Sequence, residues 1–342
     1  MQPLTALRRI AFLLERELAP TYRVRAFRNA ADVVLRRGEQ EIADRAAAGT
    51  LEELSGIGKV TAGVITEALA GDTPEYLAKL EAAAGPLVEL TADGRRLAEA
   101  LRGDLHTHSD WSDGGSPIEE MALAGIELGN SYQVLTDHSP RLTVANGLTA
   151  ERLERQLGVL ADLASRLGSF RLLSGIEVDI HEDGALDQRP DLLSRLDVVV
   201  ASVHSKLAME PAAMTRRMLA AIADPNTNVL GHCTGKMRGG RRERPPSRFD
   251  AAAVFAACAE HQVAVEINSR PERLDPPAEL LSLAVEAGCL FSIDSDAHAP
   301  GQLDWKPYGV AKAVECAVPA DRIVNTWPVE RLLDWARKPK SG

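Results

Sequence analysis

Apolar residues follow one spacing in the first part of the chain and another beyond residue 104. Leu4, Leu7, Ile10, Leu14 and Leu18 recur at helical spacing, and similar patterns continue over roughly the first 90 residues. Beyond residue 104, short apolar runs alternate with helical stretches seven times. This alternation is typical of a parallel sheet, so we predict an α/β fold closed into a seven-stranded barrel behind a small all-α domain. The expected divisions are a helical domain at 1–90, a connector at 91–102 and a barrel domain at 103–342.

The segment Leu51–Leu69 has the pattern of a helix-hairpin-helix, with Gly56-Ile57-Gly58 between two apolar-periodic stretches. The glycines permit a tight turn, and the amides that open the next helix can bind a phosphate. Such a turn holds the DNA backbone without reading its sequence. Upstream, Thr21–Arg37 holds five arginines against one acid, which is either a solvated face or a phosphate-binding surface. We expect DNA contacts from six residues of this domain: Arg23, Arg25, Arg28, Gly56, Gly58 and Lys59.

Six of the eight histidines stand at or just past the carboxyl ends of the expected strands: His106, His108, His138, His204, His232 and His298. In a β/α barrel these ends meet at one rim, where catalytic groups lie. Residues i and i+2 of a strand share a face, so His106 and His108 are expected to face one point, as are Asp296 and His298. His181 and His261 lie outside the pattern and are expected at the surface.

A single histidine at a strand end is usually a satisfied polar residue. Six of them beside carboxylates in one desolvated pocket would be costly without cations, so the pattern predicts a metal cluster. Imidazole and carboxylate ligands suit Zn, Mn or Fe, and the sequence does not choose among the three.

Composition limits the partners of the chain. The net charge of −10 opposes DNA binding except at a local basic patch, and 4% aromatic residues argue against a base-stacking platform. A second basic segment, Lys236–Arg248, holds six basic residues (Lys236, Arg238, Arg241, Arg242, Arg244 and Arg248) against Glu243. The four cysteines show no CxxC spacing, and no apolar run is long enough to span a bilayer. We therefore expect a cytoplasmic protein without a membrane partner.

Seven motifs of the second region together resemble the PHP phosphoesterase domain: HTHSDWSDG, TDHS, GIEVD, ASVH, GHCTGK, INSRPERLD and SDAH. The resemblance runs from Asp104 to about Ala336 and is closest to the PHP domain of bacterial family X DNA polymerases. The segment YRVRAFRNAA…LEELSGIGKVTAGVI resembles the small DNA-binding domain that begins those polymerases. The resemblance implies a distorted seven-stranded barrel that hydrolyses phosphate esters with bound metals.

The sequence also departs from those polymerases. The palm and thumb that would separate the two regions are absent between them, so no polymerase activity is expected. Val64 stands where relatives with lyase activity carry a lysine, which argues against Schiff-base chemistry; Lys59 lies nearby but is not equivalent.

The resemblance implies nine ligands for three divalent ions. The first ion would take His106, His108, Glu177 and Asp296; the second would share Glu177 and add His204 and His232; the third would take Asp113, His138 and His298. We expect His106, His108, Glu177, His204 and Asp296 to be the catalytic residues. Arg270, Arg273 and Lys236 stand just past strand ends and could bind the substrate phosphate or lie in surface loops. Cys233 is expected to pack rather than to bind metal.

A multinuclear cluster suits phosphate-ester hydrolysis, because two metals about 3.5–4 Å apart can hold the attacking and leaving oxygens. The first hypothesis is a nuclease that trims a DNA 3′ end or cuts at damage while the helical domain holds the DNA. The alternative is a small-molecule phosphatase of the histidinol-phosphatase type. A DNA-binding scaffold with an inactive barrel and a metal amidohydrolase rank lower, because the ligand set is complete and Glu177 stands where an amidohydrolase would carry a bridging lysine.

Overall fold

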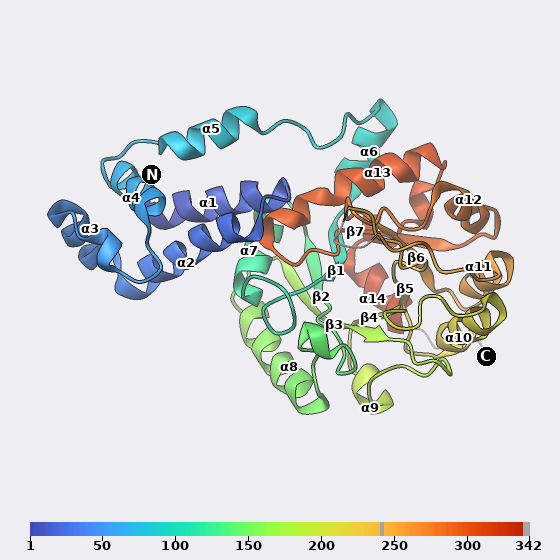
Figure 1. Cartoon of the computed structure of the whole chain (residues 1–342). Helices are drawn as coiled ribbons and strands as arrows, with labels where there is room; N and C mark the ends of the chain where they lie inside the picture. The colour runs from blue at the N-terminus through green and yellow to red at the C-terminus, as the bar shows by residue number, and fades with distance from the viewer. Residues whose placement is uncertain (240–242, 338–342) are drawn as a thin grey trace. The chain divides into compact units, whose positions relative to one another are not determined.

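The computed structural model describes residues 1–239 and 243–337, which form two compact units. The first unit is Met1–Pro86 and the second begins at Leu87 (Figure 1). Arg241 and Arg242 of the second basic segment lie outside the described residues. No described helix has the length and apolar character needed to cross a membrane.

The first unit is entirely helical. Its α-helices are α1 (Pro3–Arg16), α2 (Thr21–Arg37), α3 (Glu39–Ala48), α4 (Lys59–Leu69) and α5 (Glu75–Ala83), with a short 3-10 turn, η1 (Leu51–Glu53). Leu7 and Ile10 of α1, with Ile65 of α4 and Leu77 of α5, are fully buried, as their helical spacing predicts. Helix α1 packs against α2, α4 and α5.

The glycine-containing turn precedes α4 and packs on α2. Gly56 has φ +99°, and a Cβ there would lie 3.0 Å from Val33 Cγ2, so this position requires glycine. Gly58 has an extended backbone and open space around it. The Thr61 hydroxyl accepts the Gly58 N–H at 2.9 Å, which fixes the start of α4.

The second unit contains seven parallel strands in the order of the chain. They are β1 (Gly103–Thr107), β2 (Tyr132–Leu135), β3 (Arg171–Asp179), β4 (Val198–Ser202), β5 (Val229–Leu230), β6 (Ala264–Asn268) and β7 (Leu290–Asp294). Strands such as β4 are buried along their whole length, as expected when both faces of a parallel sheet are covered. The predicted seven-stranded α/β fold is therefore confirmed.

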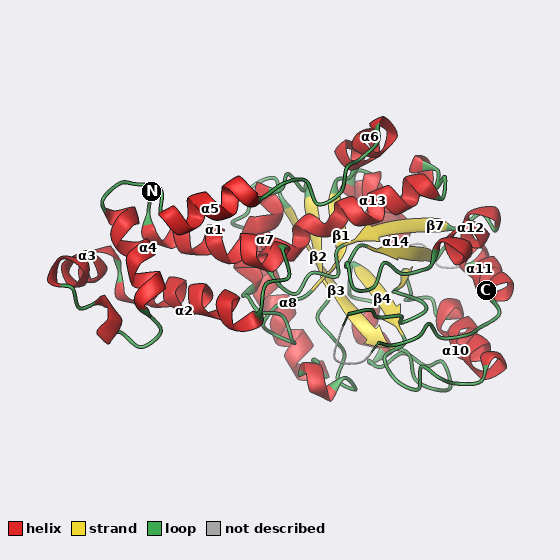
Figure 2. Cartoon of the chain, turned by 45° about the horizontal axis from the view of Figure 1, so that its top comes forward, coloured by secondary structure: helices red, strands yellow, loops and turns green. Residues whose placement is uncertain are grey.

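Helices cover the sheet between and after the strands (Figure 2). They are α6 (Ala92–Ala100), α7 (Ile118–Glu127), α8 (Ala150–Ala164), α9 (Pro190–Leu193), α10 (Pro211–Ala223), α11 (Ala251–Glu260), α12 (Ala278–Glu286), α13 (Lys306–Glu315) and α14 (Val329–Arg337), with 3-10 turns η2 (Thr143–Ala145), η3 (Pro300–Trp305), η4 (Ala320–Arg322) and η5 (Val324–Thr326). The segment expected to connect the domains contains α6, which packs against α13 within the second unit.

The apolar core of the second unit has two main parts. One joins strand residues such as Ile176, Val199 and Ile293 to the covering helices, including Phe255 of α11. The other joins alternate strand residues, including Val200, to the C-terminal segment that carries Trp327 and Trp335. Alternation along each strand therefore separates two packed layers and leaves the carboxyl ends of the strands for polar residues.

The barrel is nearly closed between β1 and β7. These strands share no continuous ladder; a single parallel bridge joins Thr107 to Ala297, and the His108 N–H donates to the Ala297 carbonyl at 2.8 Å. The Leu105 N–H donates instead to the Asp294 carboxylate at 2.8 Å. At this junction of β1 and β7, which we call the seam, a side chain thus replaces backbone pairing. This agrees with the expected distortion of the barrel.

Candidate metal centre

Strand β1 brings two histidines to the carboxyl rim through an irregularity in its pairing. Its register with β2 shifts between Asp104 and Thr107, where three residues of β1 span two of β2. A bulge of this kind re-aims side chains and is frequent beside active sites. His106 and His108 are both fully buried, with ring centroids 5.1 Å apart.

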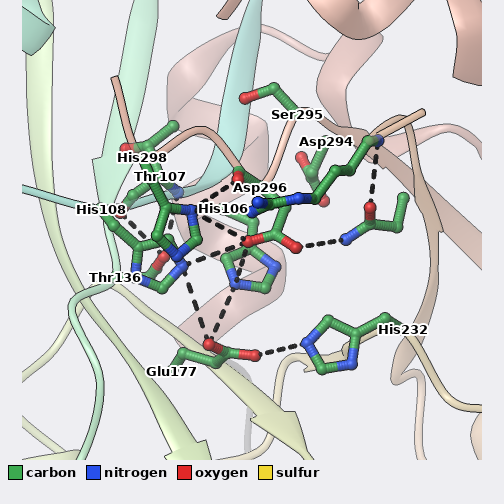
Figure 3. A network of polar contacts seen from close by, with 12 residues as sticks. His106, Thr107, His108, Thr136, Glu177, His232, Asp294, Ser295, Asp296 and His298 are labelled. Carbon is green, nitrogen blue, oxygen red and sulfur yellow. Dashed lines mark hydrogen bonds and ion pairs between the residues drawn. The ribbon is translucent and has the colours of Figure 1, made fainter. Parts of the chain in front are cut away.

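Glu177 of β3 joins His232 to the imidazoles of His106 and His108 in the network of polar contacts (Figure 3). Its Oε1 lies 2.8 Å from His232 Nε2 and 3.2 Å from His204 Nε2. Its Oε2 lies 3.4 Å from His106 Nε2 and 2.8 Å from His138 Nδ1. One carboxylate therefore faces imidazoles that come from four different strand ends.

Two further carboxylates complete the cluster on the side of His298. Asp113 Oδ1 lies 3.4 Å from His298 Nε2 and 3.5 Å from His138 Nε2. Asp296 Oδ1 lies 3.4 Å from His108 Nε2 and 3.6 Å from His298 Nδ1. All nine residues expected to bind metal thus gather at one rim.

Asp296 and His298 reach the site by a different route from the one expected. Both follow β7, and Asp296 has φ +53°, so the segment is not an extended strand that alternates its side chains. We expected both side chains to point the same way because they alternate along an extended strand. Both residues do reach the site, but strand alternation is not the reason. The strand ends before them, and the turn at Asp296 places each side chain.

Three overlapping groups of ligand atoms are compact enough to hold an ion: His108, Asp113, His138 and His298; His106, His108 and Glu177; and His138, Glu177 and His204. These groups differ from the expected division, because His108 and His138 each belong to two of them. The allocation of ligands to individual ions therefore stays a prediction.

The donor atoms themselves fit cations. Several buried nitrogen and oxygen atoms of the cluster make no aligned hydrogen bond to the described residues, although some lie close to another imidazole or carboxylate: His106 Nε2, His108 Nδ1 and Nε2, His138 Nδ1, both oxygens of Glu177, both ring nitrogens of His204 and His232 Nδ1. Each such atom costs about 1–3 kcal/mol of folding free energy if nothing compensates it. Divalent cations would satisfy imidazole and carboxylate atoms together.

Burial and mutual contact set the charge states of these groups. Burial opposes ionisation of Glu177, but imidazoles led by those of His204 and His106 outweigh it and hold the Glu177 pKa well below its ordinary value. Burial lowers the pKa of His106, whereas carboxylates led by Glu266 raise it well above the usual range. Burial and neighbouring imidazoles hold the pKa of His108 well below its usual value. An ionised Glu177 and a neutral His108 are the forms that bind metal.

A layer of residues behind the ligands orients them. Glu266 of β6 lies 2.6 Å from His106 Nδ1 and accepts the His232 N–H at 2.5 Å. Asp179 of β3 accepts the His204 N–H at 2.9 Å. The contact to the His106 ring fixes the tautomer and the orientation of that imidazole, whereas the contacts to the backbone N–H groups hold the main chain at His232 and His204.

The loop that carries Asp113 has its own anchor, Asp137. This buried carboxylate accepts the Ser109 N–H at 2.8 Å, the Ser112 hydroxyl at 2.5 Å and the Gln156 amide at 2.6 Å. The sequence places Asp137 among the acids at the strand ends, but sequence reasoning did not assign Glu266 or Asp179 to the site. An available signal was a carboxylate inside a buried strand, as in AVEIN, or two positions after Glu177 on the same strand.

The expected phosphate-binding residues lie at different depths. Arg273 Nε lies 3.0 Å from Asp296 Oδ2 and is buried. Arg270 Nη1 lies 3.3 Å from His298 Nδ1. Lys236 is half-buried in the loop after β5, where burial and Arg238 lower the pKa of its ammonium.

Two of the expected DNA contacts of the first unit have partners inside it. Arg28 Nε and Nη2 each donate a hydrogen bond of 2.8 Å to the buried carboxylate of Glu15. We therefore leave Arg28 out of the proposed DNA surface. Arg23 Nη2 donates to the Tyr76 hydroxyl at 2.6 Å. Arg25, by contrast, is exposed on α2.

Comparison with known proteins identifies both units. Residues 2–74 match the helix-hairpin-helix domain, and residues 104–270 match the PHP domain. The chain is 38% identical over 231 residues to the DNA polymerase/3'-5' exonuclease PolX of Bacillus subtilis, which covers 67% of the chain and 40% of that protein. The chain thus spans about two fifths of the length of this relative.

Other similarities are to phosphatases. The chain is 30% identical over 252 residues to the probable phosphatase YcdX of Escherichia coli, which covers 68% of the chain and 92% of that protein. The crystal structure of histidinol phosphate phosphatase from Lactococcus lactis, complexed with zinc, L-histidinol and phosphate, matches with a TM-score of 0.45 and 18% identity over 64% of the chain and 93% of that structure. The chain therefore belongs to the PHP family of metal-dependent phosphoester hydrolases, and it carries a helix-hairpin-helix domain ahead of its PHP domain.

Proposed function

We propose that this protein hydrolyses DNA phosphodiester bonds, as a 3′–5′ exonuclease or as an enzyme that processes damaged ends in DNA repair. The observation that carries the proposal is the union, in one chain, of a helix-hairpin-helix domain and a PHP barrel with all nine ligand residues at its rim. A small phosphate monoester offers nothing for the first domain to bind. The similarity to the Bacillus subtilis polymerase and exonuclease supports the same substrate class.

The helix-hairpin-helix turn would hold the DNA backbone. Gly56 and Gly58 bring the chain to the start of α4, whose first-turn amides have no acceptor within the helix and can donate to a phosphate. Lys59 is the first residue of this helix, and Arg25 is exposed on α2, which packs against the turn. These contacts would be independent of base sequence.

The metal centre would bind three divalent ions, with Mn, Zn and Fe all compatible with the ligand set. When bound, such ions supply a hydroxide nucleophile near neutral pH and offset the negative charge that develops on phosphoryl oxygens. Glu177 would hold more than one ion, because each of its oxygens faces a different set of imidazoles. Glu266 holds His106 so that its Nε2 faces the ligand cluster.

Two arginines beside the ligands would bind the scissile phosphate. Arg270 contacts His298 through one Nη group, so its guanidinium lies at the edge of the cluster. Arg273 is held by Asp296 and supplies a buried positive charge. A guanidinium fork matches two phosphoryl oxygens and would orient the phosphate for in-line attack.

The test is digestion of end-labelled DNA with added Mn²⁺, run beside phosphate release from histidinol phosphate, with wild type and Asp296→Ala. Metal-dependent shortening of DNA that is lost in the variant supports the proposal. Phosphate release without DNA cleavage would refute it.

The second candidate is a phosphomonoesterase of the histidinol-phosphatase type. It is favoured by the similarity to the probable phosphatase of Escherichia coli, which extends over 92% of that protein. The same experiment separates the two candidates, because each predicts activity on a different substrate.

A further inference from the structure

The connection from β5 to α11 is unusually long. It runs from residue 231 to residue 250, beyond the roughly 12–15 residues at which loops in compact domains become uncommon and are usually functional. Its described part folds back on itself, with Met237 and Arg244 exchanging backbone hydrogen bonds of 2.9 and 3.0 Å. We call residues 236–239 and 243–248 the basic arm.

The basic arm is fastened beside the metal centre. The Gly235 N–H donates to the carbonyl of His232 at 2.8 Å, and Arg244 Nε donates to the Gly235 carbonyl at 2.6 Å. The Arg238 N–H donates to the Glu272 carbonyl at 2.7 Å, in the loop that carries Arg270. The arm and the loop after β6 therefore form one wall of the site.

The charge of this wall is opposite to that of the chain as a whole. The basic arm carries Lys236, Arg238, Arg244 and Arg248 against the single acid Glu243, whereas the net charge of the chain is −10. Strand order places the loops after β2 and β3 on the other side of the barrel (Figure 1). Those loops carry both signs of charge: Glu182 and Asp183 are exposed after β3, and Arg141 of the loop after β2 lies 3.9 Å from Glu182. A polyanion is therefore attracted more strongly to the β5 side of the rim.

A hollow of about 350 Å³ lies between the basic arm and the loop after β4. Leu207, Met209, Pro245 and Pro246 line it with apolar surface, and its charged lining consists of Arg244, Arg248 and one acid, Glu210. The Ser247 hydroxyl donates to the Leu207 carbonyl at 2.8 Å, which joins the two sides of the hollow. Apolar surface beside two guanidinium groups matches a nucleobase and the phosphate attached to it.

We propose that the basic arm and this hollow bind a second nucleotide of the DNA strand, next to the one cleaved at the metals. The inference rests on the proposed nuclease function and names the part of the barrel that selects a polynucleotide over a monoester. Arg248 is the best probe, because it is exposed at the hollow and distant in sequence from every metal ligand.

The experiment measures KM and kcat of wild type, Arg248→Gln, Arg248→Lys and the control Arg155→Gln, which removes an exposed arginine from α8. The substrates are a single-stranded DNA oligonucleotide and p-nitrophenyl phosphate, both with Mn²⁺. We expect Arg248→Gln to raise KM for the oligonucleotide about tenfold, with Arg248→Lys intermediate because it keeps the charge and loses the fork. We expect a change of less than twofold with p-nitrophenyl phosphate, which has no second nucleotide. The slope of log KM against log salt should fall by about 0.7, the value for one lost contact to single-stranded DNA.

Two results would overturn the inference while leaving the proposed function intact: an unchanged KM for the oligonucleotide in Arg248→Gln, or an equal loss on both substrates. Absence of DNA cleavage by the wild type itself would overturn the proposed function and this inference with it. The wild-type measurement therefore separates the two failures.

Discussion

Glu266→Gln offers the sharpest test of how the protein orients its metal ligands. The Glu266 carboxylate accepts from His106 Nδ1 at 2.6 Å and from the His232 N–H at 2.5 Å, and it is fully buried. Glutamine keeps the size of the side chain but has one acceptor oxygen in place of two. It can serve one of these donors and must turn an amide N–H toward the other.

The expected magnitude follows from the lost contact. A hydrogen bond to a charged group contributes about 1.5–3 kcal/mol, and each 1.4 kcal/mol is tenfold in an equilibrium constant. We therefore expect Glu266→Gln to weaken metal binding about 10- to 100-fold, which is also the usual effect of changing an outer partner of a metal-binding histidine. Glu266→Asp keeps the charge and should recover part of the affinity.

The assay is competition for Mn²⁺ or Zn²⁺ with a chromophoric chelator, combined with activity as a function of metal concentration. Glu286→Gln is the matched control, because it makes the same substitution at an exposed position of α12. Wild-type metal affinity in Glu266→Gln would refute the idea that Glu266 positions His106. A loss of secondary structure by circular dichroism in that variant would show instead that Glu266 acts on the fold.

The remaining predictions concern the ligands, the first unit and the metals. His108→Ala or Asp296→Ala should abolish hydrolysis and leave the fold intact; full activity in either variant would contradict the ligand assignment. Removal of residues 1–90, which ends before α6, should weaken action on DNA and spare p-nitrophenyl phosphate, and an equal loss on both would show a structural role for the first unit. Arg28→Ala should lower the free energy of unfolding of the first unit by about 1.5–3 kcal/mol, because it removes the charge-assisted hydrogen bonds that Arg28 donates to the buried Glu15 carboxylate, and urea denaturation measures this. Chelation by EDTA should lower the melting temperature of the wild type more than that of Asp296→Ala, because bound metal stabilises only the folded state.

Much of the fold and of the ligand set could be predicted from the sequence, because each followed from a local pattern. Apolar runs of strand length alternating with helical stretches predicted all seven strands. Polar residues at the ends of those runs predicted where the rim would be. Eight of the nine expected ligands came together because parallel strands bring their carboxyl ends to one edge, whereas Asp113, in the loop after β1, was expected only from the resemblance to the PHP domain.

What the sequence did not reveal depended on contacts between distant segments. Arg28 looked like a DNA contact from its position in a basic helix, and only packing of α1 on α2 shows that Glu15 occupies its fork. Glu266 is 160 positions from His106 in the chain, so no local spacing predicts their contact. Asp296 carries a positive φ that a non-glycine residue rarely adopts, and alternation along a strand could not predict it.

The irregular seam between β1 and β7 explains why the metal centre lies where it does. Asp294 of β7 accepts the Leu105 N–H at 2.8 Å, and Asp104 of β1 accepts the Ser295 N–H at 3.3 Å, so each strand is held by a carboxylate of the other. The half-buried Lys306 lies beside them, with its ammonium 2.6 Å from the Asn130 amide oxygen, and its charge offsets the two acids.

A regular ladder of backbone hydrogen bonds between β1 and β7 would have kept both strands extended, with side chains alternating between the two faces of the sheet. The side-chain seam instead coincides with the register shift of β1 and precedes the turn of the chain at Asp296. These two irregularities place His106 and Asp296 within 3.9 Å of each other, from opposite ends of the barrel sequence. Because a strained backbone such as that of Asp296 persists only when surrounding contacts hold it, we interpret the cluster of Asp104, Asp294 and Lys306 as the support for His106 and Asp296, the first pair of expected metal ligands.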